Sequence, residues 1–563
     1  MNIGPMLNLY PDSLGGTLDD VVDFLKTEEA EGAFSSCYIL PSLYHTDLDR
    51  GFSVIDYSLN KMYASDETLE AIKKLGIELK LDFILNHASV LSKQFQDIIA
   101  KGEESEYKDF FINWNEFWKD CGEMTEQGYI LPEEKYLKKM FFRKPGLPIL
   151  MVRFPDGREI PYWNTFYQEV NYPEVNAPEL MKAADLQYMQ AEIIAQELSM
   201  GCPEGKKPAD ILLKIVLERK AGRLTKEQVT TVWNYMEQHR YYLGQMDLNI
   251  KSPLVWEFYD ETLKTLAAYG AKIVRLDAFA YAPKEPGEKN FLNEPGTWEV
   301  LEKVRKLADK YNLTLLPEIH ASYGEKNYEQ IAKQGYMTYD FFLPGMIIDA
   351  LESGNGSTLE KWAKELMEKE IHVVNMLGCH DGIPLLDLKG LIPEERIQQI
   401  IDTVVARGGY VKDLHGQKNV YYQVNATYYS ALGEDDKKML MARALQMFMP
   451  GKPQVWYLDL FAGKNDHEAV KRAGAGGHKE INRTNLSAAQ IEELMKTDIV
   501  KEQLKLLHFR NVSKAFGFDA ELAVSTEGEI ITFIWTNQGE SATLRANLKT
   551  FEYEITDSEG IYA

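Results

Sequence analysis

Three acidic residues stand at the ends of apolar stretches, where their carboxylates could do chemistry together. Asp277 ends KIVRLD, Glu318 ends LTLLPE, and Asp381 follows HVVNMLGCH. Each apolar stretch is typical of a buried parallel strand. In an α/β barrel the C-terminal ends of such strands meet at the face that carries the active site. We therefore expect the three carboxylates to surround one cavity at that face.

Arg275 lies two residues before Asp277, which places both side chains on one face of the expected strand. Taken alone, the two residues are explained equally well by a structural ion pair between a strand and its loop. An active site is favoured because the acid recurs at three strand ends, two of them with a neighbouring histidine, His320 and His380.

Two carboxyl groups about 5–5.5 Å apart on opposite faces of a sugar ring carry out glycosidic displacement with retention. The attacking carboxylate must be ionised, and Arg275 would hold Asp277 in that form. The other carboxyl must carry a proton near neutral pH. We expect Glu318 to do so, because the apolar residues before it would raise its pKa by desolvation.

Four short motifs resemble those of a known family. They are LDFILNH, which ends at His87, together with RLDAFAY, PEIH and CHDG, and they resemble the motifs of the α-amylase superfamily, glycoside hydrolase family thirteen. RGFSVIDY, YQVNATYYSALG, PGKPQVWYLDLFAGKND and EINR are similar to its sucrose phosphorylase branch. The resemblance covers most of the chain outside about 167–243. It implies an α/β fold with a (β/α)8 TIM barrel, a domain inserted after the third strand and a small C-terminal antiparallel β domain.

The alternation of strand and helix patterns also predicts a barrel of eight strands. The sixth strand is expected at 337–343. The alternation stops after the third strand, so we predict a barrel at 1–87 and 247–516 and an inserted domain at 88–246. A period of two near the end predicts the β domain at 517–563.

The inserted domain contains a helical insertion at about 167–243 that departs from the sucrose phosphorylase pattern. Helical spacing predicts one helical stretch at 186–198 and another at 208–243, interrupted at Gly222. The insertion either packs on the barrel or a neighbouring subunit, or forms a lid that shapes access for the acceptor. The sequence leaves both interpretations open.

The resemblance implies Asp277 as nucleophile, Glu318 as general acid and base, and Asp381 as stabiliser of the transition state. It also implies eleven residues that bind substrate, which are Asp49, Phe52, His87, Phe166, Gln245, Arg275, Tyr281, His320, His380, Gln423 and Arg483. In this branch Asp49 and Arg483 would close the far end of a pocket for one glucosyl unit. The alternatives are structural histidines, an exposed salt bridge and aromatic residues that only pack in the core.

Phosphorolysis differs from hydrolysis in that phosphate attacks the glucosyl intermediate, and phosphate needs cations near the acceptor site. Two loops offer phosphate-binding residues: FFRKPG contributes Arg143 and Lys144, and YVKDLHGQKN contributes His415 and Lys418. They match the two mobile acceptor-site loops of the sucrose phosphorylase branch. The alternative is that both are basic loops in contact with solvent alone.

The second loop departs from the pattern of sucrose phosphorylases, which carry an acid a few residues before the glutamine at Gln423. This chain has Val420 there. The loss of an acid next to His415 and Lys418 favours an anionic leaving group, which resembles the sub-branch acting on sucrose 6′-phosphate. The alternatives are unphosphorylated sucrose, glucosylglycerate, a hydrolase or transglucosidase of the same superfamily, and a protein of this fold without activity.

Composition limits the partners. The net charge of −24 over 563 residues argues against nucleic acid. No metal-binding spacing appears, so we expect no metal and no cofactor, with inorganic phosphate as co-substrate. The N-terminus has no signal-peptide pattern and no apolar stretch reaches about 18 residues. With four scattered cysteines (Cys37, Cys121, Cys202 and Cys379), this predicts a soluble cytoplasmic protein without membrane contact. The sequence leaves open whether it is a monomer or a homodimer.

Overall fold

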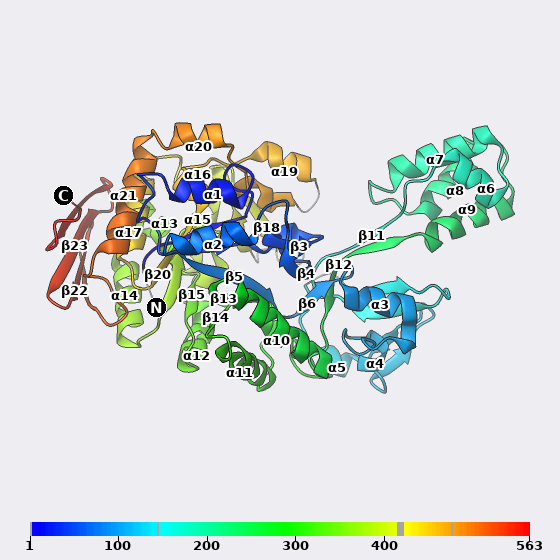
Figure 1. Cartoon of the computed structure of the whole chain (residues 1–563), viewed down its shortest axis with the longest axis horizontal. Coiled ribbons are helices and arrows are strands. Elements are labelled where there is room, and N and C mark those ends of the chain that lie inside the picture. The colour runs from blue at the N-terminus through cyan, green and yellow to red at the C-terminus, as the bar shows by residue number, and fades with distance from the viewer. Residues whose placement is uncertain (1–2, 144–145, 414–420, 475–476, 563) are drawn as a thin grey trace.

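Eight parallel strands form a nearly closed barrel, in the order β14-β13-β5-β2-β1-β20-β16-β15 (Figure 1). The computed structural model describes residues 3–143, 146–413, 421–474 and 477–562, with the backbone alone for residue 49 and for 412–413 and 421–422. The barrel strands are β1 (Met6–Leu9), β2 (Ser36–Ile39), β5 (Glu78–Ile84), β13 (Ala271–Asp277), β14 (Thr314–Pro317), β15 (Thr338–Asp340), β16 (Val373–Met376) and β20 (Lys452–Trp456). The fold class expected from the sequence is confirmed.

The barrel strands are apolar stretches because both of their faces are covered. Every residue of β1, β2, β16 and β20 is buried, and helices surround the barrel. Between the helices run two small antiparallel sheets, β3 (Tyr44–Thr46) with β4 (Val54–Leu59), and β17 (Ile383–Pro384) with β19 (Tyr421–Asn425) and β18 (Tyr410–Asp413). The helices outside the inserted segment are α1 (Leu18–Leu25), α2 (Asp66–Lys74), α10 (Pro253–Ala268), α11 (Gly296–Asp309), α12 (Asn327–Lys333), α13 (Leu343–Ser353), α14 (Ser357–Glu368), α15 (Glu394–Ala406), α16 (Tyr428–Ala431), α17 (Asp436–Phe448), α18 (Tyr457–Leu460), α19 (His467–Ala473), α20 (Ala488–Leu494) and α21 (Asp498–Val512).

The sixth strand is shorter than the sequence predicted. β15 ends at Asp340, and α13 begins at Leu343, the last residue of the expected strand. The carboxylate of Asp340 accepts hydrogen bonds from the backbone N–H groups of Phe342 (3.2 Å) and Leu343 (3.0 Å). An acidic side chain at this point satisfies the free N–H groups of a helix start, so the apolar residues that follow continue as a helix.

The segment after β5 leaves the barrel and returns to it through β12 (Tyr241–Asp247), which pairs with β6 (His87–Ser89). Much of this segment packs around the tryptophans Trp114, Trp118 and Trp163 in a cluster separate from the barrel core. Its other elements are α3 (Lys93–Lys101), α4 (Trp114–Phe117), β7 (Gly122–Met124), β8 (Ile130–Pro132), α5 (Glu134–Leu137), β9 (Ile149–Arg153), β10 (Glu159–Trp163) and β11 (Gln168–Asn171). The domain boundaries given above stay a prediction.

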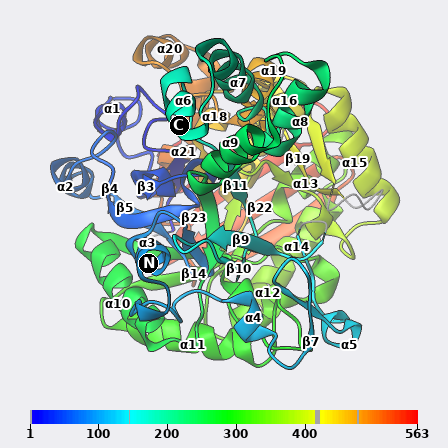
Figure 2. The same cartoon turned by 90° about the vertical axis from the view of Figure 1, so that its right-hand side faces the viewer.

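Residues 172–240 form what we call the helical arm, which stands away from the barrel beyond β11 and β12 (Figure 1) and faces the viewer in Figure 2. Its helices are α6 (Ala177–Ala184), α7 (Tyr188–Gly201), α8 (Pro208–Glu218) and α9 (Lys226–Gln238). They pack around their own apolar cluster. The predicted helical stretch at 208–243 is wrong at its end, because residues from Tyr241 onward pair with β11 as a strand.

Four antiparallel strands at the C-terminus form a separate sheet in sequence order, β21 (Glu521–Glu527), β22 (Ile530–Asn537), β23 (Glu540–Asn547) and β24 (Glu552–Asp557). Alternate residues of β22 are buried, and Trp535 donates a hydrogen bond from Nε1 to the backbone carbonyl of Phe448 on α17 (2.8 Å). The sheet therefore packs on the outside of the barrel. Among the described residues, none of the helices combines the length and apolar composition that a membrane span needs.

Candidate active site

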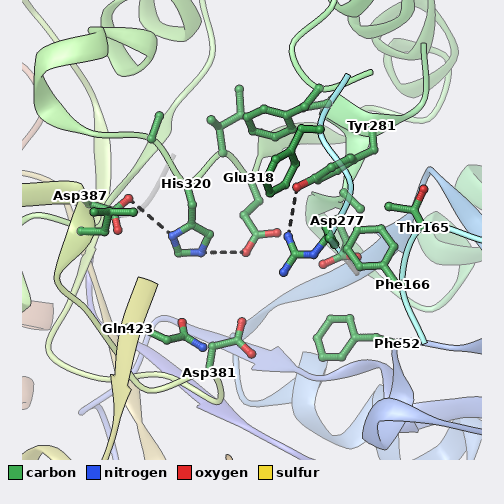
Figure 3. Close-up of a pocket in the computed structure, with 18 of the residues that line it drawn as sticks. Phe52, Thr165, Phe166, Asp277, Tyr281, Glu318, His320, Asp381, Asp387 and Gln423 are labelled. Carbon is green, nitrogen blue, oxygen red and sulfur yellow. Dashed lines mark hydrogen bonds and ion pairs between the residues drawn. The ribbon is translucent and has the colours of Figure 1, made fainter. Parts of the chain in front are cut away.

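The three acidic residues meet around one cavity at the C-terminal ends of the barrel strands (Figure 3). Asp277 is the last residue of β13, Glu318 follows β14 directly, and Asp381 lies in the turn between β16 and β17. The cavity has a volume of about 760 Å³, and all three side chains line it. The structure thus brings together acids that come from three separate strand ends.

Arg275 lies beneath the cavity and joins two of the acids. Its guanidinium places Nη1 3.0 Å from Oδ1 of Asp277 and Nη2 2.6 Å from Oε1 of Glu318. Nη1 also forms an ion pair with the buried carboxylate of Asp82 on β5, which accepts a hydrogen bond from Tyr38 Oη at 2.8 Å. Arg275 is 2% exposed, so it orients the carboxylates from below.

The pKa values of this pair differ from those expected from the sequence. Burial raises the pKa of Asp277 well above its ordinary range, and Arg275 opposes the shift without cancelling it. Burial acts in the same direction on Glu318, but Arg275 and His320 outweigh it and lower the pKa to about 2. Both expectations are therefore wrong. Burial outweighs Arg275 at Asp277, so the arginine by itself does not hold that carboxylate ionised, and the sequence did not show that Arg275 also reaches Glu318.

His320 lies between Glu318 and a further acid, Asp387 (Figure 3). Nε2 of the ring is 3.5 Å from Oε1 of Glu318, and Nδ1 is 3.6 Å from Oδ1 of Asp387. Burial alone would lower the pKa of His320, but Asp387 and Glu318 outweigh it and raise the pKa to about 9. This side of the cavity therefore presents an imidazolium at neutral pH.

Two cationic side chains and one histidine surround Asp381. Lys479 forms an ion pair with its Oδ1, and Arg483 Nη2 lies 3.7 Å from the same oxygen. Nε2 of His380 lies 3.3 Å from Oδ2. Burial works to raise the pKa of Asp381, yet His380, Lys479 and Arg483 outweigh it and hold the pKa well below its ordinary range. Asp381 is thus ionised.

Arg483 is buried behind Asp381 and does not itself line the cavity. Its Nε donates a hydrogen bond to the backbone carbonyl of His380 (2.8 Å), and its guanidinium lies over the ring of Tyr10. The backbone of Asp49 lies in the short helical turn Asp49–Gly51. The side chain of Asp49 lies outside the described part of the structure, so its pairing with Arg483 stays a prediction.

Phe52 and two histidines form an apolar wall near Asp381. The ring of Phe52 stacks on that of His380, with centroids 5.0 Å apart and an angle of 15°. Its backbone carbonyl accepts hydrogen bonds from Nε2 of His87 and Nε2 of Gln245, both at 3.1 Å. Burial lowers the pKa of His87 to about 4 and that of His380 to about 3, so both rings are neutral and suit sugar hydroxyl groups.

Phe166, Tyr281 and Arg143 line the opposite part of the cavity. The rings of Phe166 and Tyr281 meet edge to face, with centroids 5.2 Å apart. Arg143 donates a hydrogen bond from Nη1 to Tyr281 Oη (3.0 Å), and its guanidinium lies 5.0 Å from the centre of the Phe166 ring. Arg143 thus brings a positive charge to the cavity, held in place by two aromatic residues.

Gln423 on β19 also lines the cavity, near Asp381 in Figure 3. The remaining predicted phosphate-binding residues, Lys144, His415 and Lys418, lie outside the described residues. Their predicted role is therefore neither supported nor opposed by the geometry.

Lys284 joins three segments behind the cavity. Its Nζ lies 2.8 Å from Oδ2 of Asp247 and donates hydrogen bonds to Oδ1 of Asn86 (2.9 Å) and to the carbonyl of Tyr281 (2.6 Å). All of these groups are buried. The ammonium group thereby fixes the loop after β13 against the ends of β5 and β12.

Sequence reasoning missed several charged residues at the site. Asp387, Lys389 and Lys479 line the cavity, and Lys284 supports it. Asp387 could have been noticed, because it is a lone acid within the apolar stretch IPLLDL, six residues after Asp381. The lysines carry no comparable signal. Within the described ranges, no group of three or more histidine, cysteine, aspartate or glutamate side chains could hold a metal ion.

A barrel whose strand ends bring three carboxylates, two neutral histidines and an aromatic wall around one cavity defines a class of protein, the enzymes that act on glycosidic bonds. A comparison with models of protein families found no match. The chain is 47% identical over 98% of its length, and 95% of the relative's, to a sucrose 6(F)-phosphate phosphorylase of Ilumatobacter coccineus. It is 30% identical to a sucrose phosphorylase of Streptococcus mutans, over 98% of this chain and 97% of the relative.

Among solved structures, the crystal structure of sucrose 6F-phosphate phosphorylase from Thermoanaerobacter thermosaccharolyticum resembles the chain with a TM-score of 0.78 and 31% identity. The match covers 99% of this chain and 96% of that one. The chain therefore belongs to the sucrose phosphorylase branch of glycoside hydrolase family thirteen. It is an enzyme that transfers glucose with retention.

Proposed function

We propose that this enzyme transfers the glucosyl group of sucrose 6′-phosphate to inorganic phosphate and releases fructose 6-phosphate and α-glucose 1-phosphate. The observation that carries the proposal is the charge around the Glu318 side of the cavity. In a chain of net charge −24, Arg143, His320 and Lys389 all line this cavity. Such cations stabilise a phosphorylated leaving group and the attacking phosphate. The 47% identity to a protein named for this substrate supports the same reading.

In the first half of the reaction, Asp277 attacks the anomeric carbon while Glu318 gives a proton to the leaving oxygen, so that the glycosidic bond breaks as the glucosyl–Asp277 bond forms. The ionised Asp381 stabilises the positive charge that develops on the sugar. In the second half, phosphate attacks the anomeric carbon and Glu318 takes its proton, which releases Asp277. Each displacement inverts the configuration at the anomeric carbon, so two displacements in succession retain it.

The glucosyl ring would lie against Phe52 with its hydroxyl groups toward His87, His380 and Asp381. Neutral imidazoles exchange hydrogen bonds with hydroxyl groups without attracting an anion. The leaving group would lie on the side of Arg143, His320 and Gln423. The three residues outside the described part, Lys144, His415 and Lys418, are proposed to join them in binding phosphate.

The test measures release of glucose 1-phosphate from sucrose 6′-phosphate and from sucrose, each with and without inorganic phosphate. We expect product only with phosphate and a higher kcat/KM for the phosphorylated sugar. An equal or higher kcat/KM for sucrose would make the enzyme a sucrose phosphorylase, the activity named for the relative of 30% identity. Free glucose formed at the same rate without phosphate would make it a hydrolase.

We further propose that the enzyme works in the cytoplasm, without a cofactor. The four cysteines are all free thiols in the structure, which suits a reducing compartment. The proposed steps need only proton transfer and charge stabilisation, which side chains of this chain supply. Activity of protein dialysed against a chelator tests the second point, and a loss that added metal restores would contradict it.

A further inference from the structure

The residues around His320 hold its ring in an orientation in which each nitrogen faces a carboxylate. The ring stacks on Phe341, with centroids 3.8 Å apart and an angle of 18° between the planes. In this orientation Nε2 faces Glu318 at 3.5 Å and Nδ1 faces Asp387 at 3.6 Å (Figure 3). Each nitrogen therefore has one carboxylate partner, and a ring flip would keep the ring between two acids.

The carboxylate of Asp387 is buried and has few polar contacts besides His320. It lies in the short helical turn Leu386–Leu388, is 2% exposed, and its two oxygens accept no hydrogen bond from any side chain or backbone group that the structure describes. A buried carboxylate without hydrogen bonds is costly unless a cation faces it. The imidazolium of His320 is the cation placed to face it, so the positions of both residues point to a proton on this ring.

Glu318 must carry a proton to act as general acid, yet its surroundings favour the ionised carboxylate. Its proposed role requires a proton, but Arg275 lies 2.6 Å from its carboxylate and favours the ionised form. The pKa of Glu318 is lowered to about 2, whereas that of His320 is raised to about 9. At neutral pH His320 therefore carries a proton on the side of Glu318 away from Asp277 (Figure 3), one contact away from the Glu318 carboxylate.

We propose that His320 stores the proton that Glu318 delivers to the leaving group, and that Asp387 is the positioning residue that keeps the proton on this ring. The inference rests on the proposed function, because it assigns the source of the proton in that reaction. It adds to the reaction a chain of three residues, Glu318, His320 and Asp387, of which Asp387 does not touch the reacting atoms.

The transfer balances in both halves of the reaction. As the glycosidic bond breaks, the Nε2 proton of His320 passes to Glu318 while Glu318 passes one proton to the leaving oxygen, so Glu318 ends this step ionised, as it began. His320 then remains neutral with its Nδ1 proton toward Asp387. When phosphate attacks, its proton passes to Glu318 and returns to Nε2. The 3.5 Å contact must shorten by roughly 0.5 Å for transfer, as contacts of this kind do on substrate binding.

The charged groups around His320 predict a pH dependence. The groups that face the ring or line the cavity beside it are Glu318, Asp387, Glu325 and Lys389, with Arg275 and Asp381 beyond Glu318. The wild-type rate should fall as the pH rises through about 9, because His320 then loses its proton. Removal of the Asp387 charge should move this alkaline limb to lower pH by about 1 unit or more.

The test compares Asp387→Asn with wild type over pH 6–10, using sucrose 6′-phosphate and α-glucosyl fluoride, whose leaving group needs no proton. We expect the alkaline limb of kcat/KM to shift down for the sugar, and release of fluoride in a single turnover to change by less than about threefold. The matched control, Asp402→Asn on the exposed face of α15, should behave as wild type. An unshifted limb, with both substrates affected equally, would overturn the inference.

A second measurement does not depend on the variant or on the substrate. The imidazole signals of histidine-labelled wild-type protein, assigned with His320→Gln, give the pKa of His320 directly. We expect a value near 9, and a value below 7 would overturn the inference. If wild type forms glucose 1-phosphate from none of the sugars, the proposed function fails, whereas this titration still reports whether the ring is charged.

Discussion

The cavity has two walls that use the same side chain in opposite ways. On the wall around Asp381, His380 is stacked on Phe52, and burial lowers its pKa to about 3. On the wall around Glu318, His320 is stacked on Phe341 but faces two carboxylates, and its pKa is raised to about 9. Both histidines follow a barrel strand and stand within two residues of an acid.

The difference shows that an aromatic neighbour does not decide the charge of a buried histidine. What decides it is the balance of charges around the ring. His380 has one carboxylate nearby and the cations Arg483 and Lys479 beyond it, whereas His320 has a carboxylate at each nitrogen. A neutral histidine suits glucosyl hydroxyl groups and a charged histidine suits phosphate, so the two halves of the proposed substrate match the histidines of the two walls.

The largest effect on kcat is expected for Asp277, the proposed nucleophile. Asp277→Ala removes the nucleophile, and we expect kcat to fall by roughly 10⁴-fold or more. Release of glucose 1-phosphate from sucrose 6′-phosphate measures it. The matched control Asp23→Ala on α1 removes a carboxylate that is exposed and should keep full activity. Activity of Asp277→Ala within about tenfold of wild type would refute the role of this residue.

The two histidines should affect stability on opposite sides of neutral pH. The lowered pKa of His380 means that the unfolded chain binds one more proton as the pH falls from about 6.5 toward 3, so stability is lost on the acid side. The raised pKa of His320 gives stability that is complete below about 6.5 and is lost as the pH rises toward 9.

The measurement is the free energy of unfolding by urea for His380→Gln, His320→Gln and wild type. Relative to wild type, we expect a slope change of about 1.4 kcal/mol per pH unit, between pH 4 and 6 for His380→Gln and between pH 7 and 9 for His320→Gln. If both variants changed the slope on the same side of neutral pH, the contrast between the walls would be lost.

A smaller effect is expected for Arg143, which brings charge to the cavity beside Phe166 and Tyr281. Arg143→Gln should reduce the ratio of kcat/KM for sucrose 6′-phosphate to that for sucrose by about tenfold, the effect of one charged hydrogen bond. Arg158→Gln is the control, because Arg158 pairs with Asp156 on the surface. An unchanged ratio would show that Arg143 does not recognise the phosphate.

The smallest effect is expected for the helical arm, since no residue of α6–α9 is among the described residues that line the cavity. Asn171 and Tyr241 are paired across antiparallel strands, so a two-residue Asn-Gly turn can replace residues 172–240. We expect kcat/KM to change by less than about threefold. A loss of more than about tenfold would support a lid that shapes the cavity.

Gly244 lies at the base of the arm, and its backbone conformation limits how the arm can be shortened. Its φ is +127°, and a Cβ atom there would lie 2.4 Å from the backbone oxygen of Tyr167. Both features require glycine where β12 leaves β11 and turns toward β6. Any shortened arm should therefore keep this residue.

The sequence by itself determined the barrel and the three acids at its rim, because each follows a local apolar stretch that reads as a strand whatever surrounds it. The position of Arg275 beside Asp277 followed from the same local pattern. The end of the sixth strand and the strand at Tyr241 were decided by hydrogen bonds from Asp340 and by pairing with β11.

Charge at the site was decided only by the tertiary structure. Arg275 on β13 reaches Glu318 at the end of the neighbouring strand β14, and Asp387 reaches His320 from a loop after a different strand. A pKa depends on groups within a few ångströms in space, and these groups are distant along the chain. Sequence therefore located the carboxylates, whereas folding decided which groups near them carry the protons.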